Sequence, residues 1–130
     1  MATESFRLDI KSWDEQPYQE LADGRVLKSA EVMLVGESLQ GIWRALLYYG
    51  PNSTSTFTGI MPVTATLDGR SGNFVLIGPG NYDGTTARMT LEVVPGSGTE
   101  GLAGITGRAE HASTHADTPQ WPLTLTYDLP

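Results

Sequence analysis

The chain has 130 residues, with 15 Asp and Glu against 8 Lys and Arg and a formal net charge of −7. This length suits residues 1–130 as one domain with a single core, and the acidic balance disfavours nucleic acids and anionic membranes as partners. Because the chain has no cysteine, disulfides and thiolate metal sites are excluded.

Glycines and prolines divide the chain into short stretches rich in Val, Thr, Tyr, Leu and Phe, which is typical of an all-β protein. The first stretch, residues 5–13, places Phe6, Leu8 and Ile10 on one face of a strand and charged residues on the other. The segment "SWDEQPY", which overlaps its end, is expected to form a loop that caps one mouth of the fold, with solvated acidic side chains. Further strands are predicted at residues 25–35, 41–49, 54–67, 73–78, 87–94, 105–115 and 121–129.

Short turns connect these strands, and two of them contain the Asp-Gly pairs Asp68-Gly69 and Asp83-Gly84. The segment "ESLQGIWRALLYY" is the one stretch with a helical alternative, but it lacks a helical spacing of polar residues, so we predict a strand. About eight antiparallel strands in one small domain form a sandwich or a barrel, and closure removes exposed strand edges. We therefore predict a single closed antiparallel β-barrel with room inside for side chains and at most a small ligand.

The segment "VVPGSGTEGLAGITG", residues 93–107, contains Gly96, Gly98 and Gly101 at the spacing of a dinucleotide-binding loop. Such a loop works because it opens a helix whose amides receive the pyrophosphate, whereas the residues that follow here alternate as a strand does. We therefore predict no nucleotide site. Gly96, Gly98 and Gly101 are expected to adopt positive φ at a chain reversal, and Gly104 and Gly107 indicate sharp bending or close backbone approach.

Four segments, "FRLDIKSWDEQPY", "LDGRSGNFVL", "VVPGSGTEGLAGITG" and "LTLTYDL", together resemble a family of small bacterial proteins of unknown function. The known members of that family form a barrel similar to allene oxide cyclase. A Gly-Thr pair followed by a hydrophobic-x-Gly strand is also similar to a pattern in allene oxide cyclases and plant dirigent proteins. The resemblance spans nearly the whole chain and implies an allene-oxide-cyclase-like barrel. Allene oxide cyclases and dirigent proteins steer the cyclisation or coupling of reactive apolar intermediates inside the barrel.

The chain departs from the pattern of that family at polar positions. Met61 stands where the family carries an acidic residue, and Ile77-Gly78 replaces a Gln-His pair. The third strand usually carries a Glu, but here the run reads "WRALLYY". These changes indicate that one end of the barrel is more apolar and that the cavity is specialised.

Large side chains on the alternating faces are the candidates for binding a substrate in the lumen. Methionine fits irregular shapes and flat rings stack on conjugated systems, so an aromatic-walled pocket for a hydrophobic ligand is one interpretation. The other is a core packed entirely by the protein's own side chains. The candidates are Trp43, Phe57, Met61, Phe74, Met89, Trp121 and Tyr127.

Three polar side chains are the candidates for catalysis: Tyr49, Arg44 and His111. His111 shares a strand face with His115 and could exchange a proton near neutral pH. Two histidines fall short of the usual three protein ligands of a metal, so we predict neither a metal nor another cofactor. Arg44 faces water beside a carboxylate, or faces inward and anchors an oxyanion. The neighbouring tyrosines could donate a hydrogen bond to a carbonyl.

We therefore predict a cyclase or isomerase of specialised metabolism that folds a flexible, polyketide-like substrate in the lumen. The alternatives are a non-catalytic binding protein for a small hydrophobic ligand and a filled barrel that acts through its outer surface. The absence of an apolar run of roughly 18 residues and of a secretory signal predicts a cytoplasmic protein without a membrane partner. The threonine-rich outer faces are compatible with a dimer or trimer.

Overall fold

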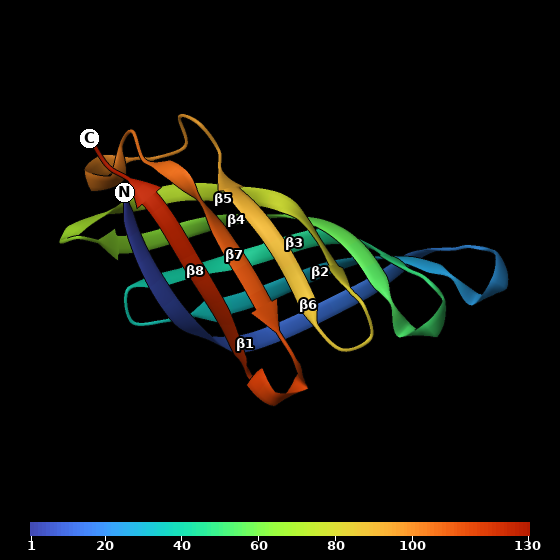
Figure 1. Ribbon diagram of the computed structural model, residues 1–130. Helices are drawn as coiled ribbons and strands as arrows, with labels where there is room; N and C mark the ends of the chain where they lie inside the picture. The colour runs from blue at the N-terminus through green and yellow to red at the C-terminus, as the bar shows by residue number, and fades with distance from the viewer.

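The computed structural model describes residues 1–130 and contains eight strands that close into one antiparallel barrel in the order of the sequence (Figure 1). The predicted fold class is therefore confirmed. Four single 3-10 turns lie between strands, at Ala22–Gly24 (η1), Pro51–Ser53 (η2), Glu100–Leu102 (η3) and His115–Asp117 (η4). The strands are β1 (Ala2–Glu20), β2 (Val26–Val35), β3 (Leu39–Tyr49), β4 (Ser55–Leu67), β5 (Arg70–Tyr82), β6 (Ala87–Val93), β7 (Thr106–Ser113) and β8 (Gln120–Asp128).

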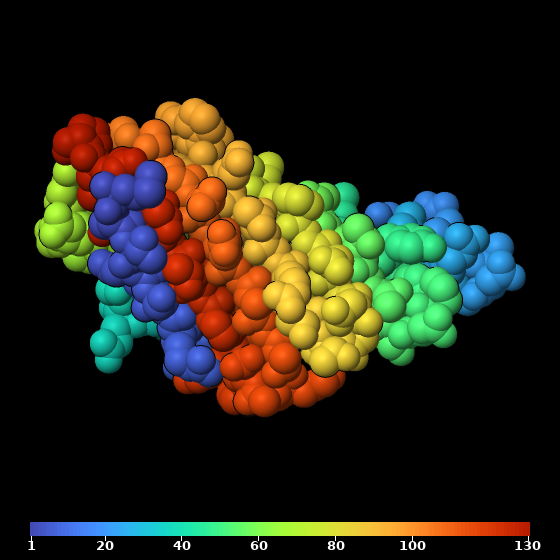
Figure 2. Space-filling model, in the orientation of Figure 1, coloured from blue at the N-terminus to red at the C-terminus, as the bar shows by residue number.

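Strand β1 closes the barrel because its two halves pair with different neighbours. Residues 2–9 pair with β8, and residues from Asp9 onward pair with β2. The far part of β1 and the start of β2 form a ribbon that projects beyond the ring at the right of Figures 1 and 2. No helix of the chain is long and apolar enough to cross a membrane.

The expected loop at "SWDEQPY" is wrong, because this segment continues β1 in register with β2. The pairing shifts by one residue between Ile10 and Ser12, so Lys11 is an extra residue in a β-bulge. A one-residue shift reverses the alternation of side chains. Simple alternation places Trp13 on the face of Lys11. Because of the bulge it lies on the same side as Ile10 and borders the cavity, with 50% of its surface exposed.

The glycine segment after β6 closes one end of the barrel and leads into no helix beyond the single turn η3. Gly96 has a positive φ of 81°, as expected for a reversal. Gly98 and Gly101 do not adopt positive φ; instead, a Cβ on Gly98 would overlap the backbone of Leu102. Leu102, from η3, is fully buried and packs this end, where both termini also lie (Figure 1).

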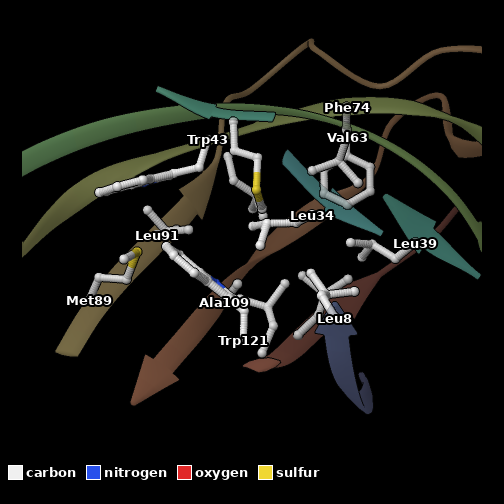
Figure 3. Close-up of a cluster of buried hydrophobic side chains, with 14 of the residues drawn as sticks. Leu8, Leu34, Leu39, Trp43, Val63, Phe74, Met89, Leu91, Ala109 and Trp121 are labelled. Carbon is white, nitrogen blue, oxygen red and sulfur yellow. The ribbon is translucent and has the colours of Figure 1, made fainter. Parts of the chain in front are cut away.

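The hydrophobic core is one cluster of 25 buried residues. Figure 3 shows Leu8, Leu39 and Phe74 on one side of the cluster, and Trp43 and Trp121 on the other. The first group belongs to the end that η3 closes, and all three are at most 1% exposed. The barrel is therefore filled at one end by its own side chains, while the aromatic residues lie toward the other end.

Candidate ligand-binding cavity

The open end of the barrel contains a cavity of about 430 Å³, within the size range of small-molecule sites. Its rim is formed by η2, η4, the end of β5 and the ribbon of β1. None of the 18 residues that line it is Asp, Glu, Lys or Arg. They are Ile10, Trp13, Trp43, Leu47, Tyr49, Ser53, Ser55, Phe57, Tyr82, Ala87, Met89, His111, Ser113, Thr114, His115, Thr118, Gln120 and Trp121.

A row of aromatic rings forms one wall of this cavity. The ring centroids are 6.2 Å apart for Trp13 and Trp121, 5.3 Å for Trp121 and Trp43, and 5.5 Å for Trp43 and Phe57. These separations lie in the range of favourable aromatic pairs. The Nε1 atoms of Trp43 and Trp121 are buried without a hydrogen-bond partner, so both indoles contribute to the wall through their apolar faces.

His111, on β7, is the one buried ionisable residue of the cavity, with 4% of its surface exposed. Its ring stacks on Trp121, with centroids 4.2 Å apart and an interplanar angle of 26°. Burial lowers the pKa of His111 below its ordinary value, and the hydrogen bond to Pro122 and the charge of Asp117 offset this in part. The imidazole is therefore neutral near pH 7.

The hydrogen bonds of His111 determine which ring nitrogen carries the proton. Nδ1 lies 2.6 Å from the carbonyl oxygen of Pro122, which can only accept, so Nδ1 is the donor. In a neutral ring Nε2 is then an acceptor, and Ser113 Oγ donates to it across 3.1 Å. Both side chains line the cavity because residues two apart on a strand share a face.

Turn η4 forms part of the rim and is held by a capping box. The backbone N–H of Thr114 donates to Asp117 Oδ2 at 2.9 Å, and the N–H of Ala116 donates to Thr114 Oγ1 at 3.3 Å. His115 lies in this turn, outside β7, with its Nε2 3.2 Å from the hydroxyl of Tyr82. The two histidines therefore belong to different elements, and only His111 is buried.

A polar cluster occupies the opposite part of the mouth, where the ribbon meets β3. The Tyr49 hydroxyl donates to Glu15 Oε1 across 2.6 Å, and Trp13 Nε1 donates to Oε2 of the same carboxylate. Lys28 Nζ lies 4.6 Å from the centroid of the Tyr49 ring. Burial, together with the hydrogen bond and charge of Glu15, raises the pKa of Tyr49. Tyr49 is therefore a protonated phenol whose hydrogen is already donated.

Six of the candidate residues predicted from sequence meet at the cavity: Trp43, Tyr49, Phe57, Met89, His111 and Trp121. Met61, Phe74 and Tyr127 are buried but lie outside the lining, because they pack the middle and the closed end of the barrel.

Arg44 requires a correction, since it faces the outside and its Nε lies 3.0 Å from Glu31 Oε2. The strand alternates, and Trp43 and Ala45 take the inward positions. Arg44 is therefore not a lumen anchor.

Two of the three family departures noted in the sequence lie away from the cavity, while the run "WRALLYY" contributes Trp43, Leu47 and Tyr49 to its lining. Met61 packs the core, and Ile77 is 44% exposed on the outer face.

Trp13, Ser113 and Ser55 also line the cavity, although none of them was predicted as a site residue. Ser113 had a detectable signal, because it lies two residues after His111 and therefore on the same strand face. Trp13 had none, since its position depends on the bulge at Lys11. Ser55 is 6% exposed and is one of two buried polar residues, the other being His111.

A second groove, of about 510 Å³, runs over the outer faces of β1 to β5. It is more open, and it is lined by surface side chains such as Arg44 and Glu31. The inner cavity is the better candidate site, because it is more enclosed and has buried walls. No group of three or more His, Asp and Glu residues is arranged to hold a metal ion.

A family model described as "Protein of unknown function (DUF3224)" matches residues 4–127. The chain is also similar to the crystal structure of a protein with unknown function from the DUF3224 family of Shewanella oneidensis MR-1. The TM-score is 0.68 and the sequence identity 21%, and 99% of each chain is covered. At that identity the likeness concerns the fold. No curated protein matches the chain.

Proposed function

The chain belongs to the DUF3224 family, whose description assigns no activity, and we propose that it is a cyclase or isomerase acting on a small hydrophobic molecule in the barrel cavity. A flexible, polyketide-like substrate would fold against the aromatic wall and undergo intramolecular ring closure. Among the reactions of this class, a cycloaddition needs least from the protein beyond the positioning of the reacting atoms.

The observation that carries this proposal is the cavity itself. It lies against the buried rings of Trp43, Phe57 and Trp121 at one end of a barrel that is filled at the other, and no lining residue bears a fixed charge. Apolar, concave sites with a few polar groups are typical of binding sites for small organic molecules. The size of the cavity, about 430 Å³, supports a ligand of a few fused rings or a folded chain of similar bulk.

Positioning could supply most of the acceleration. Holding reacting atoms of one molecule in a near-attack arrangement can lower a barrier by roughly 7–11 kcal/mol in the best cases. The tryptophan row would restrict the chain, and His111 would contact a polar group of the substrate. The resemblance to allene oxide cyclases and dirigent proteins supports the same class of function.

A non-catalytic binding protein is the second candidate, and the Tyr49 hydroxyl favours it. This hydroxyl donates to Glu15, so it is not available to polarise a substrate carbonyl. Of the three residues predicted for catalysis, His111 alone is then placed to take part. A carrier or sensor would need the cavity but no catalytic side chain.

The test uses linear trienes that carry a diene and an electron-poor alkene and close by intramolecular cycloaddition at a measurable uncatalysed rate. Product formation is followed by liquid chromatography and mass spectrometry, and binding by calorimetry. Ala87→Phe, at the cavity wall, should abolish both effects by filling the space. Ala112→Phe, on the outer face of the adjacent strand, is the matched control and should retain them.

The outcomes separate the two candidates. Acceleration that is lost in Ala87→Phe and kept in Ala112→Phe supports the enzyme. Binding with unchanged rates and products supports the non-catalytic binding protein. Absence of binding across such probes contradicts both candidates.

A further inference from the structure

The polar groups of the cavity determine which ligand chemistry it can satisfy. A carboxylate or phosphate would lack a cationic partner, because no Lys or Arg lines the cavity. Two cations near the mouth are already paired: Lys28 lies over the Tyr49 ring and within 3.9 Å of Glu15, and Arg7 is bound to Gln120 and Asp117. An anion that enters such a site loses its hydration without compensation. The ligand should therefore be neutral.

His111 provides a buried acceptor rather than a donor. Its Nδ1–H is committed to Pro122, so the ring can offer only the lone pair of Nε2. That lone pair now receives the hydroxyl of Ser113, a short side chain that can rotate away. A neutral ligand with a hydroxyl group could replace the Ser113 hydroxyl at Nε2 and keep the buried acceptor satisfied.

We infer that the ligand of this cavity is a flat, conjugated molecule with an enol or phenol hydroxyl that donates to Nε2 of His111 in place of Ser113. The inference rests on the proposed function, since it specifies what that cavity binds. A conjugated hydroxyl fits better than an aliphatic one for two reasons. It is the stronger donor, and its planar framework can lie against the indoles of Trp121 and Trp43, which form the adjacent wall.

The experiment compares 2-naphthol with 2-methoxynaphthalene, which has the same rings but no hydroxyl hydrogen. Calorimetry gives the ratio of the two dissociation constants for the native protein and two variants. His111→Phe keeps a flat ring beside Trp121 but removes the acceptor, and it should reduce the preference for 2-naphthol by roughly 3- to 10-fold, the worth of one hydrogen bond. Ser113→Ala removes the competing donor and should increase that preference.

A second measurement follows the acceptor atom itself in the native protein. Two-bond proton–nitrogen spectra report the ¹⁵N resonance of His111 Nε2, which should move when 2-naphthol binds and move less with the methyl ether. This measurement and the Ser113→Ala variant keep the inference testable if His111→Phe does not fold.

Failure of the inference differs from failure of the proposed function. If both probes bind, while the preference is the same in every folded variant and Nε2 responds equally to both, the hydroxyl does not reach His111. The inference then fails and the cavity proposal stands. If neither probe binds, both fail.

Discussion

His111 is the residue whose titration should be most visible in the stability of the protein. Burial lowers its pKa, so the unfolded chain takes up a proton near pH 6.5 while the folded protein still holds the neutral ring. The free energy of unfolding should therefore fall as the pH drops below about 6.5, by at most roughly 1.4 kcal/mol per pH unit. Urea unfolding between pH 7 and 5.5 measures this slope.

The variant His111→Phe isolates the effect, because it retains the carboxylates, including Asp117, and His115. The difference in slope between the native protein and the variant belongs to His111. Equal slopes would mean that the imidazole is protonated in the folded protein as readily as in the unfolded one.

The absence of a side chain at Gly59, on β4, makes room for Trp43 on the adjacent strand β3. A Cβ built on this glycine would overlap Nε1 of Trp43, and the surrounding core leaves that indole 2% exposed. Gly59→Ala should therefore lower the free energy of unfolding by about 1–3 kcal/mol, as overpacking does, and shift the Trp43 ring in the cavity wall. Thermal unfolding and near-ultraviolet circular dichroism measure the two effects.

Gly50→Ala is the matched control for that substitution. Its Cβ would meet only the Tyr48 ring, at 3.2 Å, and the Thr54 side chain, at 3.4 Å, and both can move. A loss of stability as large in Gly50→Ala as in Gly59→Ala would show that the fit to Trp43 is not the cause.

At the scale of elements, η3 packs against one end of the barrel and closes it. Leu102 is its one buried side chain and is fully enclosed against the end of the sheet. Leu102→Ala should cost about 2–5 kcal/mol, the range for a leucine truncated in a core, whereas Leu46→Ala, 55% exposed on β3, should cost far less. Chemical denaturation of both variants tests this, and similar losses would contradict a plugging role for η3.

The strands show which structural features follow from the sequence pattern and which depend on strand pairing. In β4 every second residue from Ser55 to Leu67 is buried, so plain alternation gave its bounds and inner face to within a residue. In β1 the bulge at Lys11 reverses that alternation, and no local residue pattern identifies a bulge. Because this register shift is not visible in the sequence, "SWDEQPY" was predicted as a loop and Trp13 was not predicted as a site residue.

Alternation also predicts part of the site, but it does not predict which inward residues surround the cavity. Trp43, Phe57, Met89, His111 and Trp121 follow from alternation combined with residue size. Which inward residues fill the barrel and which surround a space depends on where η3 inserts, and that is a property of the closed ring. Met61, Phe74 and Tyr127 are inward residues at the filled positions.

At the scale of the whole molecule, the filled and hollow ends share the same strands, and this should couple ligand binding to global stability. Strand β3 runs from Leu39 in the packed end to Tyr49 at the mouth, so neither end can unfold without breaking the ring. A ligand at 100 times its dissociation constant should add about 2.7 kcal/mol to the free energy of unfolding. The slowest-exchanging amides near Leu67, far from the cavity, should then exchange roughly 100-fold more slowly, as should those near Phe57. Hydrogen exchange with and without 2-naphthol measures both sites, and protection confined to the mouth would mean that the two ends open independently.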